Sequence, residues 1–255
     1  MSSDHSIKSD TKCIILAFVA VFVQIVSVKV FKYFFGDAFA EGTLTNGVID
    51  ILLTLVSTAF PTVIFLIFGE RKKYFSSKRE FEVKRAVIYL LWALGLGYTF
   101  RIVFFSVTSL LSFFDSGAVN GAGISVAVSY FVSAVVIPSV FEEVFYRGIL
   151  IDLFERFKGG VVITAMLFAV SHNGIVSMVN AFVFGLLIGY VYKRTRSIYY
   201  CITIHFINNL IAFCGVIANN GDVLYYAAKY LPYIIAICGI CLVIISMVRK
   251  RDIFR

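Results

Sequence analysis

Two adjacent glutamates and an arginine, Glu142, Glu143 and Arg147, lie in a stretch that is otherwise apolar from about residue 121 to 153. A charged side chain at the centre of a bilayer costs about 3 kcal/mol or more, so three of them together need a reason to be there. On a helix, Glu143 and Arg147 are four residues apart on one face and can neutralise each other. Glu142 points about 100° away and has no partner within its own helix. We interpret the pair as an anchor and Glu142 as the carboxylate that carries out chemistry.

Pro138 interrupts the hydrogen bonding of the same stretch, four residues before Glu142. Because proline has no backbone N–H, it removes one helical hydrogen bond and frees the carbonyl oxygen of Ala134.

Two histidines also lie deep in apolar runs. His205 and Asn209 are four residues apart and share a helix face, with Asn208 beside them. His172 lies in an earlier run and is followed by Asn173. One interpretation is that these groups are interhelical hydrogen-bonding residues, which are common in membrane bundles. The other is that they belong to a catalytic site.

The chemistry that these residue types allow is the activation of a water molecule. A carboxylate with a neighbouring imidazole can take a proton from water. A second imidazole with a carboxamide provides donors for a tetrahedral oxyanion. A divalent metal such as Zn²⁺, held by Glu142, His172 and His205, is an alternative, although the HExxH motif is absent. Ser171 is a poor nucleophile candidate, because it adjoins His172 and adjacent residues on a helix point apart.

The elements that must position these groups are predicted to be membrane helices. The chain is 60% hydrophobic, against 45–50% apolar residues in a typical soluble domain. The excess lies in long runs, which predicts an all-α polytopic membrane protein with one membrane domain at 13–255. We expect residues 1–12 to be a disordered polar tail and the five cysteines to be structural. The eight apolar segments are about 13–35, 46–69, 86–114, 121–151, 160–173, 175–192, 197–218 and 230–248.

The distribution of lysine and arginine predicts the orientation. Eighteen of them lie in the two tails and the even-numbered loops, whereas the opposite loops contain only Lys229. This asymmetry places both termini in the cytoplasm and requires an even number of crossings. The net charge of +8 is therefore attributed to the membrane surface, and nucleic acid is not an expected partner. Segments 160–173 and 175–192 are short for two crossings, so one or both are expected to be tilted or re-entrant.

The three groups proposed for catalysis lie at similar depths. Counted from the cytoplasmic end of each segment, Glu142, His205 and His172 are about 15, 12 and 18 Å deep. Hydrogen-bonding residues that serve only packing need not share a level. The common depth favours a site in the cytoplasmic half of the membrane.

The pattern resembles the CAAX prenyl endopeptidase and bacteriocin-processing family of intramembrane proteases, called CPBP or Abi. The matching region covers about 120–215 of the chain. The family motifs EExxxR, FxxxH, FxxG and HxxxN read here as Glu142-Glu143-x-x-x-Arg147, Phe168-x-x-x-His172, Phe182-x-x-Gly185 and His205-x-x-x-Asn209. This sequence departs from the family in the very short connection between His172 and the FxxG segment. Gly185 and Gly189 also form a GxxxG spacing, which we attribute to helix packing.

The resemblance implies peptide-bond hydrolysis in a membrane cavity that is open to the cytoplasm. It implies that Glu142 and His172 activate water and that His205 and Asn209 stabilise the oxyanion. Glu143 and Arg147 are then supporting residues, as are Asn208 and Phe168. The family has been described both as glutamate-dependent and as metal-dependent, so the cofactor question stays open. The implied substrates are hydrophobic or lipid-modified peptides. The compactness of the chain favours a bacterial plasma membrane.

Two other functions fit parts of the sequence. A non-catalytic immunity or scaffold protein could keep a polar cluster for folding, but it would not need an unpaired Glu142. An ion-coupled transporter also uses intramembrane carboxylates and histidines. Against a transporter, Lys29 and Lys32 can reach the headgroups and Asp50 lies near a segment edge. The role of Arg101 is then unexplained, and no inverted repeat of broken helices is evident.

Overall fold

The structure of the chain is a computed structural model. It describes residues 2–35, 44–68, 81–109, 124–155, 157–218 and 223–249. The basic loop between the second and third predicted segments, at about 69–85, lies mostly outside the described residues. The basic residues at 250–255 and the side chains of Lys29 and Lys32 also lie outside them. The described part is almost entirely helical and contains no strand.

The described residues form eight helical segments, the number of apolar segments that the sequence predicts. The fourth segment is one continuous path through four shorter elements. The segments are α1 (Ser2–Phe35), α2 (Leu44–Phe68), α3 (Val83–Ser109), the composite of α4 (Ile124–Phe131), η3 (Val132–Val136), α5 (Ile137–Glu143) and η4 (Val144–Ile151), then α6 (Gly160–Val170), α7 (Ile175–Thr195), α8 (Ile198–Ile217) and α9 (Val223–Arg249). Helix α1 begins within the segment that we expected to be a disordered tail.

Six of these helices are long and apolar enough to cross a membrane, which makes the chain an all-α multi-pass membrane protein. They lie in α2, α3, the composite helix, α7, α8 and α9. The apolar part of α1, Thr11–Ser27, and helix α6 are shorter. With 11 residues, α6 is about 16 Å long and cannot cross about 30 Å of hydrocarbon alone. The fifth predicted segment is thus a partial crossing, whereas the sixth is a full-length helix.

The composite helix contains two π-helical stretches, η3 and η4, around the short helix α5. Wide π turns are rare and are frequently found at functional sites. Pro138 lies in the first turn of α5, directly after the first wide stretch. Because proline lacks the N–H that a regular helix would use at this position, the hydrogen-bond pattern is interrupted where the first wide stretch ends. The sequence analysis located the lost hydrogen bond but not the change in helical pitch.

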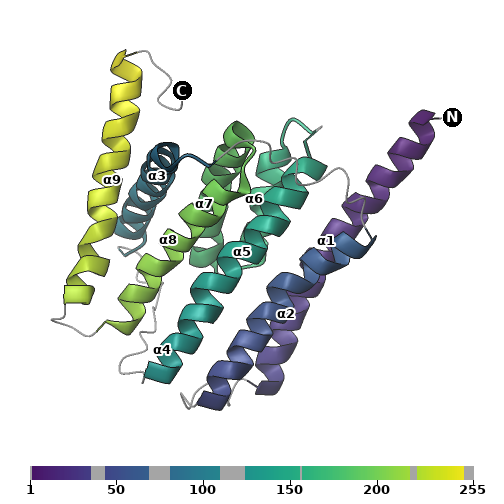
Figure 1. The fold of residues 1–255 in the computed structure, drawn as a ribbon, viewed down its shortest axis with the longest axis horizontal. Coiled ribbons are helices and arrows are strands. Elements are labelled where there is room, and N and C mark those ends of the chain that lie inside the picture. The colour runs from purple at the N-terminus through teal and green to yellow at the C-terminus, as the bar shows by residue number, and fades with distance from the viewer. Residues whose placement is uncertain are drawn as a thin grey trace.

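Figure 1 shows the helices arranged side by side in a slanted bundle. Helices α1 and α2 form one flank, α3 and α9 the other, and the composite helix, α6, α7 and α8 lie between them. The start of α1 and the end of α9 lie at the same end of the bundle (Figure 1), as an even number of crossings requires. Which end faces the cytoplasm stays a prediction from the charges.

Two groups of buried apolar residues hold the bundle together, and the polar cluster lies between them. The first joins α1 and α2 to η4, α6 and α7 through residues such as Phe65, Phe145, Tyr146 and Phe168. The second joins α3, α7, α8 and α9 through residues such as Leu94, Ile188, Ile204 and Ile235.

Small residues allow α6 to lie directly on α7. A Cβ atom on Gly189 would come within 2.7 Å of Val161 Cγ1, and one on Gly185 within 3.1 Å of Ala165 Cβ. The GxxxG spacing therefore serves close helix packing, as predicted. This contact fixes the carboxyl end of α6, where Phe168 and His172 lie, against the helix that carries the FxxG residues.

Candidate active site

A buried ion pair forms the base of the site. Arg147 donates from Nη1 to Glu143 Oε1 over 2.8 Å, and both side chains are almost completely buried. The pairing predicted from their spacing of four residues is confirmed. The Arg147 guanidinium also lies 4.5 Å from the centre of the Phe168 ring, which is cation–π geometry. The pair thus fixes one glutamate of the motif and connects the composite helix to α6.

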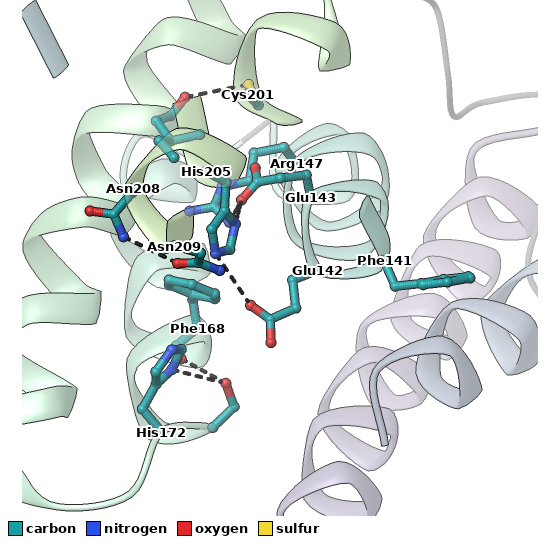
Figure 2. Close-up of polar contacts among 12 residues, drawn as sticks. Phe141, Glu142, Glu143, Arg147, Phe168, His172, Cys201, His205, Asn208 and Asn209 are labelled. Atoms are coloured by element: carbon teal, nitrogen blue, oxygen red, sulfur yellow. Dashed lines mark hydrogen bonds and ion pairs between the residues drawn. The ribbon is translucent and has the colours of Figure 1, made fainter. Parts of the chain in front are cut away.

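His205 on α8 contacts both glutamates (Figure 2). Its Nδ1 is 2.7 Å from Glu143 Oε1, and its Nε2 is 4.0 Å from Glu142 Oε2. An ionised carboxylate only accepts hydrogen bonds, so Nδ1 carries the hydrogen that is donated to Glu143. Nε2 is consequently the nitrogen that can exchange a proton or donate toward a substrate.

The separation between Glu142 and His205 has a chemical consequence. At 4.0 Å the two groups are too far apart for a direct hydrogen bond. A polar contact of this length can be bridged by water or by a substrate oxygen. The Glu142 side chain is 12% exposed, whereas that of Glu143 is 0% exposed. Of the two glutamates, Glu142 is therefore the one that a small molecule can reach.

Asn209 is held in place at both ends of its carboxamide. Its Nδ2 donates to the carbonyl oxygen of Ala134 over 3.1 Å. Its Oδ1 accepts a hydrogen bond of 3.2 Å from Asn208 Nδ2. An amide nitrogen has two hydrogens, so one remains for a further acceptor. The Ala134 carbonyl oxygen, which Pro138 was predicted to free, is thus the acceptor of the Asn209 hydrogen bond.

His172 lies at the end of α6 and is oriented by its own helix. Its Nδ1 is 2.9 Å from the carbonyl oxygen of Phe168, and its ring packs edge-to-face on the Phe168 ring. Among the described residues no hydrogen bond or ion pair joins His172 to Glu142, and Figure 2 shows the Phe168 ring between His172 and His205. Ser171 donates to the same Phe168 carbonyl and is 3.5 Å from His172 Nδ1.

A cavity of about 210 Å³ brings most of these groups together. His172, His205, Asn208, Asn209 and Phe168 all line it, although they come from two separate parts of the sequence, α6 with the turn after it and α8. Glu142 is not among the lining residues, but its Oε2 is 4.0 Å from Nε2 of His205, which does line the cavity. The remaining lining residues are Leu94, Gly97, Tyr98, Arg101, Ser177, Asn180, Ala181, Val183 and Phe184.

Residues 124–211 match the family model described as type II CAAX prenyl endopeptidase Rce1-like. About a third of the chain is therefore similar to this family. The match runs from the start of α4 into α8 and contains every residue of the four motifs. Comparisons with curated proteins and with solved structures found no match.

The similarity to this family supports a peptidase of the CAAX intramembrane type in general. It agrees with the resemblance to CPBP or Abi proteases that the motifs indicate. The assignment of individual catalytic residues rests on the geometry above.

The three candidate metal ligands of this Rce1-like segment do not form a cluster. Within the described part of the chain, no three His, Cys, Asp or Glu side chains are grouped so that they could hold a metal ion. Glu142 and His205 are near each other, but His172 has Nδ1 on a backbone carbonyl of its own helix. In this arrangement, the residues do not fit a three-ligand zinc site.

Several polar residues that line the cavity were not predicted from the sequence. Ser177 and Asn180 on α7 contribute to its wall, as does Tyr98 on α3. A signal for α7 existed, because Ser177, Asn180 and Phe184 recur at spacings of three and four residues. Tyr98 precedes Arg101 by three residues, so the two share a face of α3.

Proposed function

We propose that the protein is an intramembrane endopeptidase that hydrolyses peptide bonds of membrane-associated or lipid-modified substrates of the CAAX type. The observation that carries the proposal is the position of His205 between a buried, arginine-paired Glu143 and an accessible Glu142, beside a polar cavity. Glu143 orients the imidazole of His205. Glu142 provides a carboxylate that can bind the same water molecule as His205 Nε2.

In the proposed reaction, Glu142 takes a proton from a water molecule. The water oxygen forms a bond to the carbonyl carbon of the substrate, and the carbonyl oxygen becomes an oxyanion. Collapse of this intermediate breaks the C–N bond, and the proton passes from Glu142 to the leaving amine. Proton transfer by one positioned side chain contributes about 10²- to 10⁴-fold.

The geometry of His205 supports its role as an oxyanion donor. With Nδ1–H directed to Glu143, a proton on Nε2 makes the ring an imidazolium, which the Glu143 carboxylate stabilises. The attacking water and the oxyanion are attached to the same carbon atom. A base and an oxyanion donor that lie 4.0 Å apart therefore suit one tetrahedral intermediate. The second hydrogen of Asn209 Nδ2 would be the other donor.

His172 is the second proton-accepting group in the proposal. Its Nδ1 is directed to the Phe168 carbonyl, so Nε2 is the nitrogen left for water or substrate. It lines the same cavity as His205, on the other side of the Phe168 ring. Cleavage by the His172→Ala variant tests its contribution.

The surroundings of the site favour a hydrophobic peptide substrate, with membrane lipids as the other partners. Apolar residues of α3 and α7 share the cavity wall with the polar groups. We propose a plasma-membrane location in a bacterium, with the termini in the cytoplasm. Lipidated proteins, peptide pheromones and bacteriocin-like peptides are substrates of suitable chemistry.

The experiment is cleavage of a hydrophobic peptide library by the purified full-length protein in detergent. Wild type should release products that mass spectrometry identifies, and Glu142→Ala and His172→Ala should each lose most of the activity. Persistent cleavage in Glu142→Ala would overturn the assignment of Glu142 as the base. Substrate-coupled ion flux in liposomes without cleavage would favour a transporter, and the absence of both activities a scaffold protein.

A further inference from the structure

Gln24 is a buried polar residue of α1, a helix that precedes the part of the chain matched by the family model. Its Oε1 accepts a hydrogen bond of 3.1 Å from the hydroxyl of Tyr146, which is also buried. Tyr146 directly precedes Arg147 in the EExxxR motif. Polar side chains commonly join helices in membrane bundles, and this bond joins α1 to the segment that carries the proposed base.

Tyr146 also contacts the residues that orient His172. Its ring lies edge-to-face against the Phe168 ring, with 5.1 Å between the ring centres. The backbone carbonyl of Phe168 accepts a hydrogen bond of 2.7 Å from Ser171 Oγ and is 2.9 Å from His172 Nδ1. The Ser171 hydroxyl also interacts with the hydroxyl of Tyr146. Tyr146 therefore meets the carboxyl end of α6 with both its ring and its hydroxyl.

Tyr146 lies near Glu142 as well. The two residues are four apart on the composite helix, where α5 passes into η4, and the Glu142 carboxylate acts electrostatically on the Tyr146 hydroxyl. Figure 2 shows Glu142 directed toward the side of the site on which Phe168 and His172 lie. No hydrogen bond or ion pair joins Glu142 to His172 in the described part of the chain. Tyr146 thus interacts with Glu142 on one side and with the turn that carries His172 on the other.

We propose that Tyr146 is a positioning residue of the catalytic site and that Gln24 fixes it through its hydroxyl. The hydrogen bond to α1 holds the ring against Phe168, so the turn that carries His172 keeps its place relative to Glu142. A displacement of catalytic groups by about 1 Å can slow a reaction about 100-fold. Helix α1 is therefore part of the catalytic unit, although it lies outside the matched residues. This inference rests on the proposed peptidase function.

The test compares Tyr146→Phe, Gln24→Met and the double variant in the full-length protein in detergent. Each single variant leaves one buried polar group without its partner and should unfold at a lower temperature than wild type. The double variant replaces both partners by apolar side chains of similar shape, which can be nearly neutral for stability. Its unfolding temperature should therefore return toward that of wild type.

Cleavage should not return with stability. On a peptide that wild type cleaves, kcat of Tyr146→Phe and of the double variant should both be on the order of 10- to 100-fold lower. KM should stay within about twofold, because the substrate contacts are not removed. A hydrogen bond that serves folding alone would give the double variant wild-type cleavage.

Tyr192→Phe is the matched control. The buried Tyr192 also donates a hydrogen bond of 3.1 Å from its hydroxyl, in this case to Asp152 Oδ2. Asp152 is ten residues beyond Glu142 along the chain, about 15 Å away in a helix. This variant should keep kcat within about twofold of wild type, because it removes a similar bond far from the reacting groups.

The possible results separate the two proposals. If the double variant regains both stability and cleavage, the positioning role is wrong and the peptidase function stands. The same holds if Tyr192→Phe slows cleavage as much as Tyr146→Phe, or if KM rises while kcat is unchanged. An unchanged kcat in Tyr146→Phe, measured below its unfolding temperature, overturns the role even if the double variant does not fold. If wild type cleaves no member of the peptide library, both proposals fail.

Discussion

Asn209 on α8 donates a hydrogen bond of 3.1 Å to the carbonyl oxygen of Ala134, the carbonyl that Pro138 cannot serve four residues later. The contact joins α8 to the π-helical stretch η3. It explains why a proline is useful so close to the glutamates, since a regular helix would have used this acceptor internally. Because Pro138 leaves this carbonyl oxygen free, it can hold the Asn209 carboxamide in a fixed position beside the catalytic cavity.

The first prediction concerns Asn209. Replacing Asn209 by Ala removes an oxyanion donor and its anchor, so cleavage should fall about 100-fold. The measurement is kcat on a peptide that the wild-type protein cleaves. Asn208→Ala is the control, because Asn208 Nδ2 only donates to Asn209 Oδ1 among the described contacts. It should lose less than tenfold, and an equal loss in both variants would contradict the oxyanion role.

The second prediction separates the adjacent glutamates. Glu143→Gln leaves Arg147 buried without its charge partner, and breaking a buried pair in this way lowers stability by about 3–5 kcal/mol. Glu142→Gln should leave stability nearly unchanged, because Glu142 is partly exposed and its Oε2 is 4.0 Å from His205 Nε2, too far for a direct hydrogen bond. Thermal unfolding in detergent provides the comparison.

Activity should show a different pattern from stability in these two variants. Glu142→Gln should remain folded and lose about 10³-fold or more of cleavage, as expected for loss of a general base. A folded and active Glu142→Gln protein would contradict the mechanism. A Glu143→Gln protein as stable as wild type would show that the ion pair contributes little to the fold.

Much of this site could be predicted from the sequence because its signals are local. The spacing of Glu143 and Arg147 predicts their contact, and charges in apolar runs mark the depth of Glu142, His172 and His205. The contact between His205 and Glu143 could not be predicted, since it joins residues 62 positions apart and depends on how α8 rotates against the composite helix. For the same reason, the predicted partnership of Glu142 with His172 is not seen as a direct contact, and Glu142 lies nearest His205.

The helix boundaries could likewise be predicted only in part. Apolar runs located all eight helical segments, but they could not show that the fifth ends at Val170. The residues after it, from Ser171 to Gly174, form a turn in which Gly174 has a φ of 82°. A glycine adopts this conformation without strain. That turn places His172 directly after a short helix inside the bundle, and a hydropathy pattern does not contain this information.

The third prediction concerns metal dependence. Because the described residues contain no group of three ligands, treatment with EDTA or 1,10-phenanthroline should change cleavage less than twofold. Metal analysis of the purified protein should find less than one zinc per chain. Loss of activity with a chelator, and its recovery with added Zn²⁺, would show that the side chains rearrange to bind a metal.

The fourth prediction concerns Asp152, which follows η4 at the end of the composite helix. Burial raises the pKa of this carboxyl above its ordinary value of 3.8, although hydrogen bonds from Tyr192 and Arg196 act in the opposite direction. A raised pKa means that the folded state favours the protonated carboxyl. The stabilisation from Asp152 is therefore complete below pH 3.8 and is lost as pH rises through the folded-state pKa.

Asp152→Asn removes this titration and keeps an acceptor for the Tyr192 hydroxyl. The unfolding temperature of wild type should therefore fall relative to that of Asp152→Asn as pH rises above about 4. Glu155→Gln is the matched control, because Glu155 also pairs with Arg196 but its side chain is 48% exposed. It should follow the wild-type curve, since exposed ion pairs contribute little to stability. If Asp152→Asn instead lost stability relative to wild type as pH rose, the ion pair with Arg196 would outweigh the burial of Asp152.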